Sequence, residues 1–356
     1  MSHNLKILDI FNSDLYRTNL IKNPYVIAEA GVNHEGSMNL AYRLIEEAKE
    51  GGADAIKFQT YKANTIASKY SPSYWDTNKE PTTSQYKLFQ KYDKFWKNEF
   101  EKLKIFCDKV EIEFMSTPFD LESSNFLNDL MDVYKISSSD ITNKPFIEHI
   151  CNFKKPIILS TGASTLEEIE DAVKWIDSKN IPLSLLHCIL NYPTENQNAN
   201  LGMIKDLQMN FPNKIIGYSD HTMPEKMHTL ELATLLGSAI LEKHFTHDKK
   251  LKGNDHYHAM DKDDLKLFKL NLKQLLSIIG SQEKNYIKSE KVARSNARRS
   301  LVAKKSIVSG SIIKLDDITW KRPAHGISPA LIDKVVGLKA VKNIAEDESI
   351  QWNMLF

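Results

Sequence analysis

The stretch IIGYSDHT, residues 215–222, begins as an apolar run and ends on a serine, a carboxylate and an imidazole. Polar groups buried at the end of a strand cost free energy unless they find partners. Seven other apolar runs of strand length end in the same way: YVIAEAG (25–31), AIKFQTY (55–61), FMSTPF (114–119), VYKISSS (133–139), PIILSTG (156–162), LSLLHC (183–188) and AILEKHF (239–245). The polar ends of these eight runs need a common explanation.

The segments between the runs have the spacing of amphipathic helices. Residues 40–48 place their apolar side chains on one helical face, and the glycine pair at 51–52 predicts the end of that helix. Ser164 and Glu167 predict a capping box for another helix, and Pro224 predicts the first turn of a third. Strands that alternate with helices favour a parallel sheet, and eight such units predict a closed (β/α)₈ TIM barrel. An open doubly wound sheet is the second choice.

The carboxyl ends of parallel strands meet at one edge of a barrel, where the active sites of this fold lie. We therefore expect the polar groups that end the eight runs to share one pocket. These groups are Asn33, His34, Glu35, Lys57, Gln59, Ser116, Thr117, Lys135, Ser138, Ser160, Thr161, His187, Ser219, Asp220, His221, Glu242, Lys243 and His244.

His221 and His244 end the seventh and eighth runs, which are neighbours in a barrel. Two imidazoles on adjacent strand ends can bind one divalent cation, and Glu35 and Asp255 can join them. The alternative is that each histidine only caps its strand through hydrogen bonds. A mixed nitrogen and oxygen site suits Mn²⁺ or Mg²⁺ as well as Zn²⁺, so spacing alone does not name the metal.

Lys57 and Lys135 lie inside apolar runs, where an unpaired ammonium group is costly. One interpretation is that each lysine pairs with a nearby buried carboxylate. The other is that the two lysines, together with neighbouring serine and threonine hydroxyls, bind a phosphate or carboxylate dianion. The number of hydroxyl residues at the same strand ends favours anion binding.

Residues 62–96 form a long connection rich in tyrosine and tryptophan, which leaves the same edge of the predicted barrel. Connections of this length are usually functional or disordered, so we expect a lid over the pocket. Aromatic and lysine side chains also suit single-stranded nucleic acid. However, 47 basic and 46 acidic residues nearly cancel, which argues against a nucleic-acid or membrane-surface partner.

Cysteine usage and the N-terminal sequence favour a cytoplasmic protein. The three cysteines match neither a disulfide framework nor a zinc site, so we expect reduced thiols. The first residues lack the pattern of a signal peptide, and no apolar run is long enough to cross a membrane.

The pattern changes near the C-terminus to short alternating runs with a turn at Gly310. We expect a barrel domain at 1–285, a charged linker at 286–296 and a small β-rich domain at 297–356.

Ten motifs in this chain occur in the order of a known family. They are IAEAGVNHEGS, GADAIKFQTY, STPFD, YKISS, KPIILSTG, HCILNYPT, IGYSDHT, EKHFT, RRSLVA and WKRPAHGIS. The chain resembles, from about residue 20 to its end, the N-acetylneuraminate (sialic acid) synthase family, the nonulosonate synthases. The resemblance implies a TIM-barrel synthase followed by an antifreeze-like (SAF) domain.

The resemblance also implies a reaction. Members of this family condense phosphoenolpyruvate with N-acetylmannosamine or a related acylamino sugar and water, and they release phosphate. The implied cofactor is a divalent metal, Mn²⁺ with Mg²⁺ or Co²⁺ as alternatives, bound by His221 and His244. Glu35 is implied near the metal and the aldehyde, as a candidate for acid–base catalysis with both histidines.

The resemblance assigns substrate positions residue by residue. Those for phosphoenolpyruvate are Lys57, Gln59, Thr117, Lys135, Ser138, Ser160 and Ser219. Those for the sugar are Glu35, Asp140, Tyr192, Asp255 and Arg322. Arg322 is implied to reach the sugar site of a second subunit, so we expect a domain-swapped homodimer.

Three departures from the family pattern lie on the sugar side. Asp140 stands where glutamate is usual, Leu190 stands where a polar residue is usual, and the loop around Asp255 contains His256 and His258. Two rival functions are a non-catalytic glycan-binding protein and a phosphoenolpyruvate-dependent synthase that uses a sugar phosphate such as arabinose 5-phosphate. The sugar-phosphate enzyme needs a second phosphate site, and no further basic cluster is visible at the strand ends.

Overall fold

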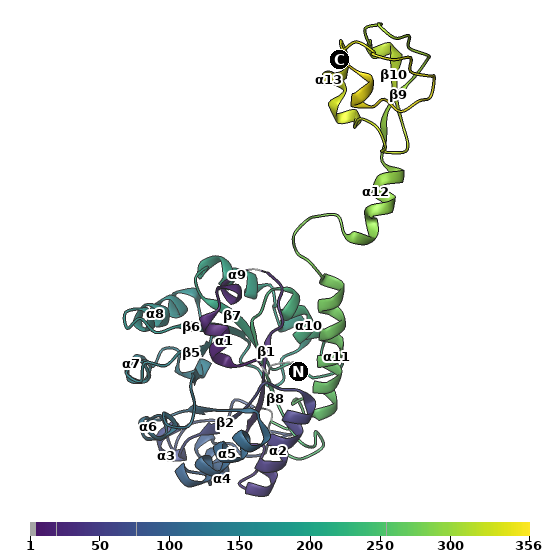
Figure 1. The fold of residues 1–356 in the computed structure, drawn as a ribbon. Coiled ribbons are helices and arrows are strands. Elements are labelled where there is room, and N and C mark those ends of the chain that lie inside the picture. The colour runs from purple at the N-terminus through teal and green to yellow at the C-terminus, as the bar shows by residue number, and fades with distance from the viewer. Residues whose placement is uncertain (1–4, 19, 76, 254) are drawn as a thin grey trace. The chain divides into compact units, whose positions relative to one another are not determined.

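A computed structural model describes residues 5–18, 20–75, 77–253 and 255–356 of the protein. The chain divides into two compact units, Met1–Gly280 and Ser281–Phe356. The first unit contains the predicted strand and helix repeats, and the second contains the β-rich C-terminal segment (Figure 1). The finer boundaries at 285 and 297 stay a prediction.

All eight predicted strands are present in the first unit and form one parallel sheet. They are β1 (Tyr25–Gly31), β2 (Ala55–Thr60), β3 (Glu113–Pro118), β4 (Tyr134–Ile136), β5 (Ile157–Ser160), β6 (Leu183–Cys188), β7 (Ile215–Asp220) and β8 (Ile240–His244). Their hydrogen-bonded order is β3-β2-β1-β8-β7-β6-β5-β4, and β3 and β4 contact each other where the ring closes. The predicted TIM-type barrel is confirmed, and the open sheet is excluded by the β1–β8 pairing.

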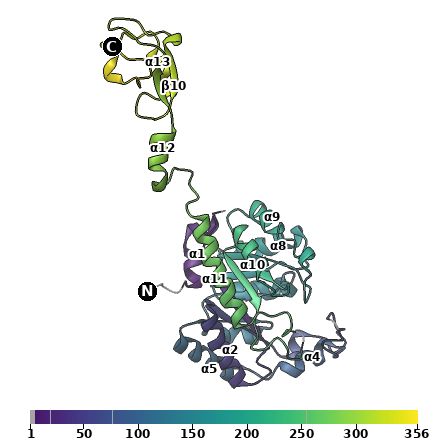
Figure 2. The same cartoon turned by 90° about the vertical axis from the view of Figure 1, so that its right-hand side faces the viewer.

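Helices surround the sheet (Figure 1). They are α2 (Met38–Gly51), α3 (Ala63–Ile66), α4 (Gln85–Tyr92), α5 (Lys97–Val110), α6 (Leu121–Leu127), α7 (Lys144–Cys151), α8 (Leu166–Asp177), α9 (Met203–Asn210), α10 (His228–Leu235) and α11 (Lys262–Ile279). The last of these, α11, packs against both α2 and α10 (Figure 2). None of the helices in the described residues is long and apolar enough to span a bilayer.

Two of the predicted helix starts are wrong. Thr165 and Glu168 form the capping box of α8, one residue after the predicted pair, because the Thr165 hydroxyl accepts from the backbone of Glu168. Pro224 lies four residues before α10, and its carbonyl accepts a hydrogen bond from the Met227 backbone in a separate turn. The predicted end of α2 is confirmed, since Gly52 takes a left-handed conformation with φ 93°.

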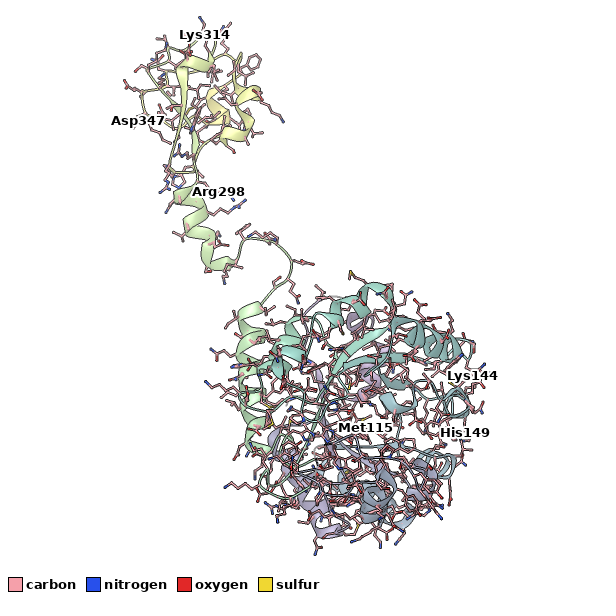
Figure 3. All side chains as sticks on the ribbon, turned by 180° about the vertical axis from the view of Figure 1, so that it is seen from behind. Met115, Lys144, His149, Arg298, Lys314 and Asp347 are labelled. Atoms are coloured by element: carbon pink, nitrogen blue, oxygen red, sulfur yellow. The ribbon has the colours of Figure 1, made fainter. Side chains whose placement is uncertain are left out.

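The barrel interior has an apolar level at the amino ends of the strands. The helix α1 (Ile7–Asn12) packs Ile7, Ile10 and Phe11 against strand residues that include Met115. Figure 3 labels Met115 near the middle of this unit, and Lys144 and His149 of α7 at its outer edge. This apolar level fills one end of the interior, and Glu113 accepts hydrogen bonds there from Tyr25 and from the Ile7 backbone.

The second unit is small and has its own core. After η4 (Lys288–Glu290) and α12 (Lys291–Ala297), strands β9 (Ser300–Ala303) and β10 (Ile318–Lys321) form an antiparallel pair. The short turns η5 (Leu315–Asp317), η6 (Pro329–Leu331), α13 (Ile332–Val335) and η7 (Trp352–Met354) complete it. Figure 3 labels Arg298, Lys314 and Asp347 on this unit. The charged segment predicted as a solvated linker is exposed, but it contains the helix α12.

Candidate active site

Alternation along the strands decides which polar side chains reach the barrel interior. Successive residues of a strand point to opposite faces, so Ser219 and His221 share one face while Asp220 points to the other. Asp220 accepts hydrogen bonds from Thr229 of α10 at 2.9 Å and from Lys243 of β8 at 2.8 Å. This ion pair is almost completely buried. The carboxylate of IIGYSDHT therefore ties β7 to β8, and its predicted place in the pocket is wrong.

Lys243, the partner of Asp220, and His34, which stacks on Phe95, also line neither of the cavities described below, and three further strand-end residues that we predicted in the pocket are bound elsewhere. Ser116 pairs with the Thr60 hydroxyl at 2.6 Å, and Thr161 donates to the Leu186 carbonyl at 3.0 Å. His187 donates from Nε2 to the Ala199 carbonyl at 2.8 Å. These three side chains do not line the basic cavity described below. Their hydrogen bonds hold together neighbouring parts of the barrel wall.

The inward-facing polar residues line one cavity, which we call the basic cavity. Its empty volume is about 370 Å³ when the open mouth is counted. The lining residues are Glu29, Lys57, Gln59, Thr117, Phe119, Lys135, Ser137, Ser138, Ser160, Cys188, Tyr192, Ser219, His221, Glu242 and His244. All seven residues predicted to bind phosphoenolpyruvate are among them, as are both predicted metal ligands.

Close backbone approach shapes one side of the basic cavity. The Gly162 N–H donates to the Ser138 hydroxyl at 2.9 Å, and a Cβ at position 162 would lie 2.9 Å from that oxygen. Glycine is therefore required at this position for Ser138 to keep its place. On the other side, Lys57 donates to the Thr117 hydroxyl at 3.0 Å, which orients the ammonium group.

The two lysines of the basic cavity are paired with two buried glutamates. Lys57 forms an ion pair with Glu29 and lies 3.7 Å from Glu242. Lys135 also lies 3.7 Å from Glu242. Each lysine thus has a buried carboxylate partner, as the first of the two interpretations of these lysines expects. Both nevertheless line the cavity, so they remain available to an anion that enters it.

Burial and mutual attraction set the charges in this cluster. Burial raises the pKa of Glu29 to about 7, although Lys57 opposes the rise. Burial alone would lower the pKa of Lys57, but Glu242 and Glu29 outweigh it and the pKa is raised. Burial lowers the pKa of Lys135, and Glu242 offsets this only in part. Glu29 therefore changes its charge near neutral pH, and its protonation makes the cavity more positive.

His221 and His244 have the properties of metal ligands. His221 donates from Nδ1 to the Ile189 carbonyl at 2.7 Å, which leaves Nε2 as the coordinating nitrogen. Burial favours a lower pKa for His221, but the Cys188 sulfur and the Ile189 carbonyl outweigh burial, and the pKa is raised. A cation that binds to His221 therefore competes with protons for the ring. Burial, with His258 and His221, lowers the pKa of His244 well below its ordinary value, so that ring is neutral. The two ring centroids are 5.4 Å apart.

A second group of possible ligands includes His244. One ligand atom from each of His244, Asp255 and His258 lies within 4.8 Å of the other two. Imidazole and carboxylate donors at these separations fit a divalent cation with open positions for substrate oxygens. His221 is outside this close group, and His258 was not among the residues predicted to bind the metal.

A second cavity, which we call the aromatic cavity, adjoins the basic cavity. It has an empty volume of about 700 Å³, open mouth included, and shares Gln59, Tyr192 and His244 with the basic cavity. Its other lining residues are Val32, Asn33, Tyr61, Tyr74, Trp75, Leu88, Phe89, Tyr92, Gly253, Asp255 and His256. The connection at 62–96 supplies five of them, so it forms one wall of the site; that it closes as a lid stays a prediction.

Three predicted sugar-binding residues line neither cavity within the described residues. The Glu35 side chain is 40% exposed and lies 3.6 Å from His256 Nε2. Asp140 accepts a hydrogen bond from Asn143 at 2.9 Å. Arg322 is exposed and belongs to the second unit, where the Ala324 N–H donates to the Ser295 carbonyl beside it. Tyr192 and Asp255 do line the aromatic cavity.

Sequence reasoning missed Glu29 and Cys188 as residues of the site, noted His258 only as part of the loop on the sugar side, and named Glu242 only as a polar strand end. Glu29 and Glu242 have a signal in the sequence, since a buried strand lysine predicts a buried carboxylate on a neighbouring strand. Cys188 has no such signal, because a small buried thiol is ordinary in a barrel core.

Comparisons with known proteins place the chain in a family. The model of the NeuB family matches residues 44–284, and the model of the SAF domain matches residues 298–355. An N,N'-diacetyllegionaminic acid synthase of Campylobacter jejuni is 40% identical over 93% of this chain and 100% of its own length. A second protein of that name, from Legionella pneumophila, is 36% identical over 92% of this chain and 93% of its own length.

A solved structure is also similar. The N-acetylneuraminic acid (sialic acid) synthetase of Leptospira borgpetersenii, determined in complex with citrate, is 34% identical to this chain. The match covers 76% of this chain and 90% of that one, with a TM-score of 0.68.

Proposed function

The chain belongs to the NeuB family, and we propose that it condenses phosphoenolpyruvate with an acylamino sugar and water to give a nonulosonic acid and phosphate. One observation carries the proposal. A lysine-lined cavity adjoins a larger aromatic cavity, and Gln59, Tyr192 and His244 line both. A reaction that joins an anion to an uncharged sugar needs this division.

Phosphoenolpyruvate would occupy the basic cavity. Lys57 and Lys135 would hold its phosphate and carboxylate, and the hydroxyls of Thr117, Ser138 and Ser160 would donate to the same oxygens. Since Lys57 is already fixed by Glu29 and Thr117, it needs no rearrangement when the anion enters.

The sugar aldehyde would reach the boundary between the cavities. C3 of phosphoenolpyruvate attacks the aldehyde carbon, the aldehyde oxygen takes a proton, and water adds at C2. The C2–O bond to phosphate then breaks, which leaves a ketone and free phosphate. A divalent cation on His244, when bound, supplies a Lewis acid for the aldehyde oxygen. The lysines stabilise the departing phosphate.

Two carboxyl groups are candidates for the proton transfers. Glu35 is the one that the family resemblance implies, and it lies at the exposed edge of the site. Glu29 is buried in the basic cavity, with a pKa of about 7 that suits a general acid or base near neutral pH. Glu29→Gln and Glu35→Gln separate them, since the residue that transfers the proton should remove one limb of the pH–rate profile.

The acceptor sugar would be unphosphorylated and would carry two acetamido groups. The described lining of the aromatic cavity contains no lysine or arginine, so it offers no second phosphate site. Its tyrosines, Trp75 and Phe89 suit acetamido methyl groups and deoxygenated carbons. The names of the two relatives above specify a diacetylated product.

The working unit would be a dimer in which Arg322 serves the partner's sugar site. An exposed guanidinium on a unit joined by an exposed segment can bind acyl or hydroxyl oxygens of a sugar. Mixing Arg322→Ala chains with His221→Ala chains tests this arrangement. Heterodimers should regain one intact site and part of the activity, whereas a heterodimer as inactive as its parents would assign Arg322 to its own barrel.

The main test is phosphate release from phosphoenolpyruvate with Mn²⁺ and a panel of sugars. The panel contains a diacetamido sugar, N-acetylmannosamine, its 6-phosphate and arabinose 5-phosphate. We expect release that depends on the acylamino sugar, fastest with the diacetamido compound. Turnover with arabinose 5-phosphate alone would replace the proposal with the rival synthase. Sugar binding without any phosphate release would favour the glycan-binding protein.

A further inference from the structure

The loop that follows β8 returns to the site and carries three polar side chains, Asp255, His256 and His258. We propose that His258 is a direct ligand of the active-site metal, in addition to His244 and beside Asp255. This inference rests on the metal dependence of the proposed function. It goes beyond the pair His221 and His244 that the family resemblance implies.

The first support is the distance between ligand atoms. One atom each from His244, His258 and Asp255 lies within 4.8 Å of the other two, and the two ring centroids are 5.0 Å apart. Metal–ligand bonds of about 2.0–2.2 Å place neighbouring donor atoms roughly 3–4 Å apart in a tetrahedral or octahedral shell. Small side-chain rotations therefore suffice to bring the three atoms onto one ion.

The second support is that the backbone fixes His258 beside the strand end. The Met260 N–H donates to the His244 carbonyl at 2.8 Å, and the Thr246 N–H donates to the Met260 carbonyl at 2.9 Å. These two hydrogen bonds hold Met260, two residues after His258, alongside the end of β8. A ligand held in this way loses little entropy when a metal binds.

The third support is a hydrogen bond to the backbone of Asp255, the residue that bears the carboxylate. The buried Asn33 side chain donates to the Phe245 carbonyl at 3.0 Å and to the Asp255 carbonyl at 3.2 Å. Asn33 thus holds the other part of the loop to the end of the same strand. Asp255 Oδ2 lies 3.7 Å from His244 Nδ1 as a result.

The surroundings of His258 give a fourth support. The side chain is completely buried, and the next two residues, Ala259 and Met260, are completely buried as well. The ring is therefore shielded from bulk water, as the ligands of an enclosed metal site are. The Tyr192 ring lies 5.8 Å from both His258 and His244, so all three rings face the same region.

The additional imidazole should change which metals bind. Carboxylate and water ligands suit Mg²⁺ and Mn²⁺, whereas imidazole favours later metals such as Co²⁺ and Zn²⁺. A site with His258 should therefore prefer Co²⁺ over Mg²⁺ more strongly than a site without it.

The test is metal binding by the protein alone, with no substrate present. Metal-free protein is titrated with Co²⁺, and the visible absorption of the bound ion and the heat of binding are followed. We expect His258→Ala to weaken Co²⁺ binding by about tenfold or more, in line with the losses that follow changes around a metal site. The absorption spectrum should change as one nitrogen ligand is lost, and Mg²⁺ binding should weaken less.

Three variants keep the outcome unambiguous. His247→Ala, a matched control that lines neither cavity, should bind Co²⁺ as the unmodified protein does. His258→Gln keeps most of the volume and serves if the alanine variant does not fold. His244→Ala should lose binding in every version of the site.

The results separate the two proposals. If His258→Ala or His258→Gln keeps the affinity and spectrum of the unmodified protein while His244→Ala loses binding, His258 is not a ligand and the metal proposal survives. If His244→Ala also keeps full affinity, the metal proposed for the reaction is itself at another place.

Discussion

The basic and aromatic cavities adjoin, yet they are built from different parts of the chain. The basic cavity is lined mainly by inward-facing strand residues, whose positions the parallel ladders fix. The aromatic cavity is lined mainly by connections, namely the segment at 62–96 and the loop after β8. Strand positions tolerate little change, whereas loops vary without disturbing the barrel. The difference indicates that the reaction is set by the strands and the choice of sugar by the loops.

The largest expected effect is at the boundary that both cavities share. His244→Ala should reduce kcat by about 1,000-fold or more, because it removes a ligand of the metal that would stabilise the developing charge by several kcal/mol. Chelation should have the same effect, and Mn²⁺ should reverse it. Turnover by metal-free protein at the normal rate would contradict the assignment.

The next effect compares a strand lysine that faces the basic cavity with one that faces outward. Lys135→Met should raise the Kd for phosphoenolpyruvate by more than about tenfold, or roughly 1.4 kcal/mol, and leave the KM for the sugar nearly unchanged. Titration calorimetry measures the Kd, and steady-state kinetics measure the KM.

Lys243→Met is the matched control, since it removes an equally buried strand lysine that faces outward and pairs with Asp220. It should lower the free energy of unfolding by about 3–5 kcal/mol and leave the Kd for phosphoenolpyruvate unchanged. Equal changes in Kd for both variants would mean that Lys135 is structural.

A third prediction addresses the aromatic cavity alone. Phe89→Ala removes one aromatic ring from the lining of that cavity. It should raise the KM for the sugar about five- to tenfold, which corresponds to a loss of roughly 1–1.4 kcal/mol of aromatic contact. The KM for phosphoenolpyruvate should stay the same. Phe106→Ala, which removes an aromatic ring that packs on Tyr42 away from both cavities, is the control. A change confined to phosphoenolpyruvate would reverse our assignment of the two cavities.

The smallest effect is a dependence on pH within the basic cavity. Glu29 has a pKa of about 7, so it is neutral at lower pH and negatively charged at higher pH. Its negative charge opposes an entering anion, and we therefore expect the Kd for phosphoenolpyruvate to rise about three- to tenfold between pH 6 and 8. Glu29→Gln should flatten this part of the profile. An unchanged slope in that variant would assign the titration to another group.

The same contrast explains how much the sequence predicted. The apolar runs of strand length and the helical spacing between them predicted all eight strands, and the seven residues predicted to bind phosphoenolpyruvate line one cavity. The pattern did not say which face each polar residue takes. Asp220 was therefore placed in the pocket, although a one-residue step along β7 turns it toward Lys243.

Loop residues were harder to predict. His258 is ten or more residues from any strand motif, and its position beside His244 depends on the return of the loop and the pairing of Met260 with the end of β8. No local periodicity encodes such a return. The capping pair of α8 was missed by one residue for a similar reason, because Ser164 and Thr165 are both good N-caps and only the backbone turn decides between them.

The measurement that tests the division of the two cavities most directly is a crystal structure with phosphoenolpyruvate and Mn²⁺ bound. We predict that the phosphate and carboxylate lie within hydrogen-bond distance of Lys57 and Lys135, with C3 directed toward the aromatic cavity near His244. Phosphoenolpyruvate bound among Tyr74, Trp75 and Phe89 instead, with the lysines still paired only to Glu29 and Glu242, would contradict the account.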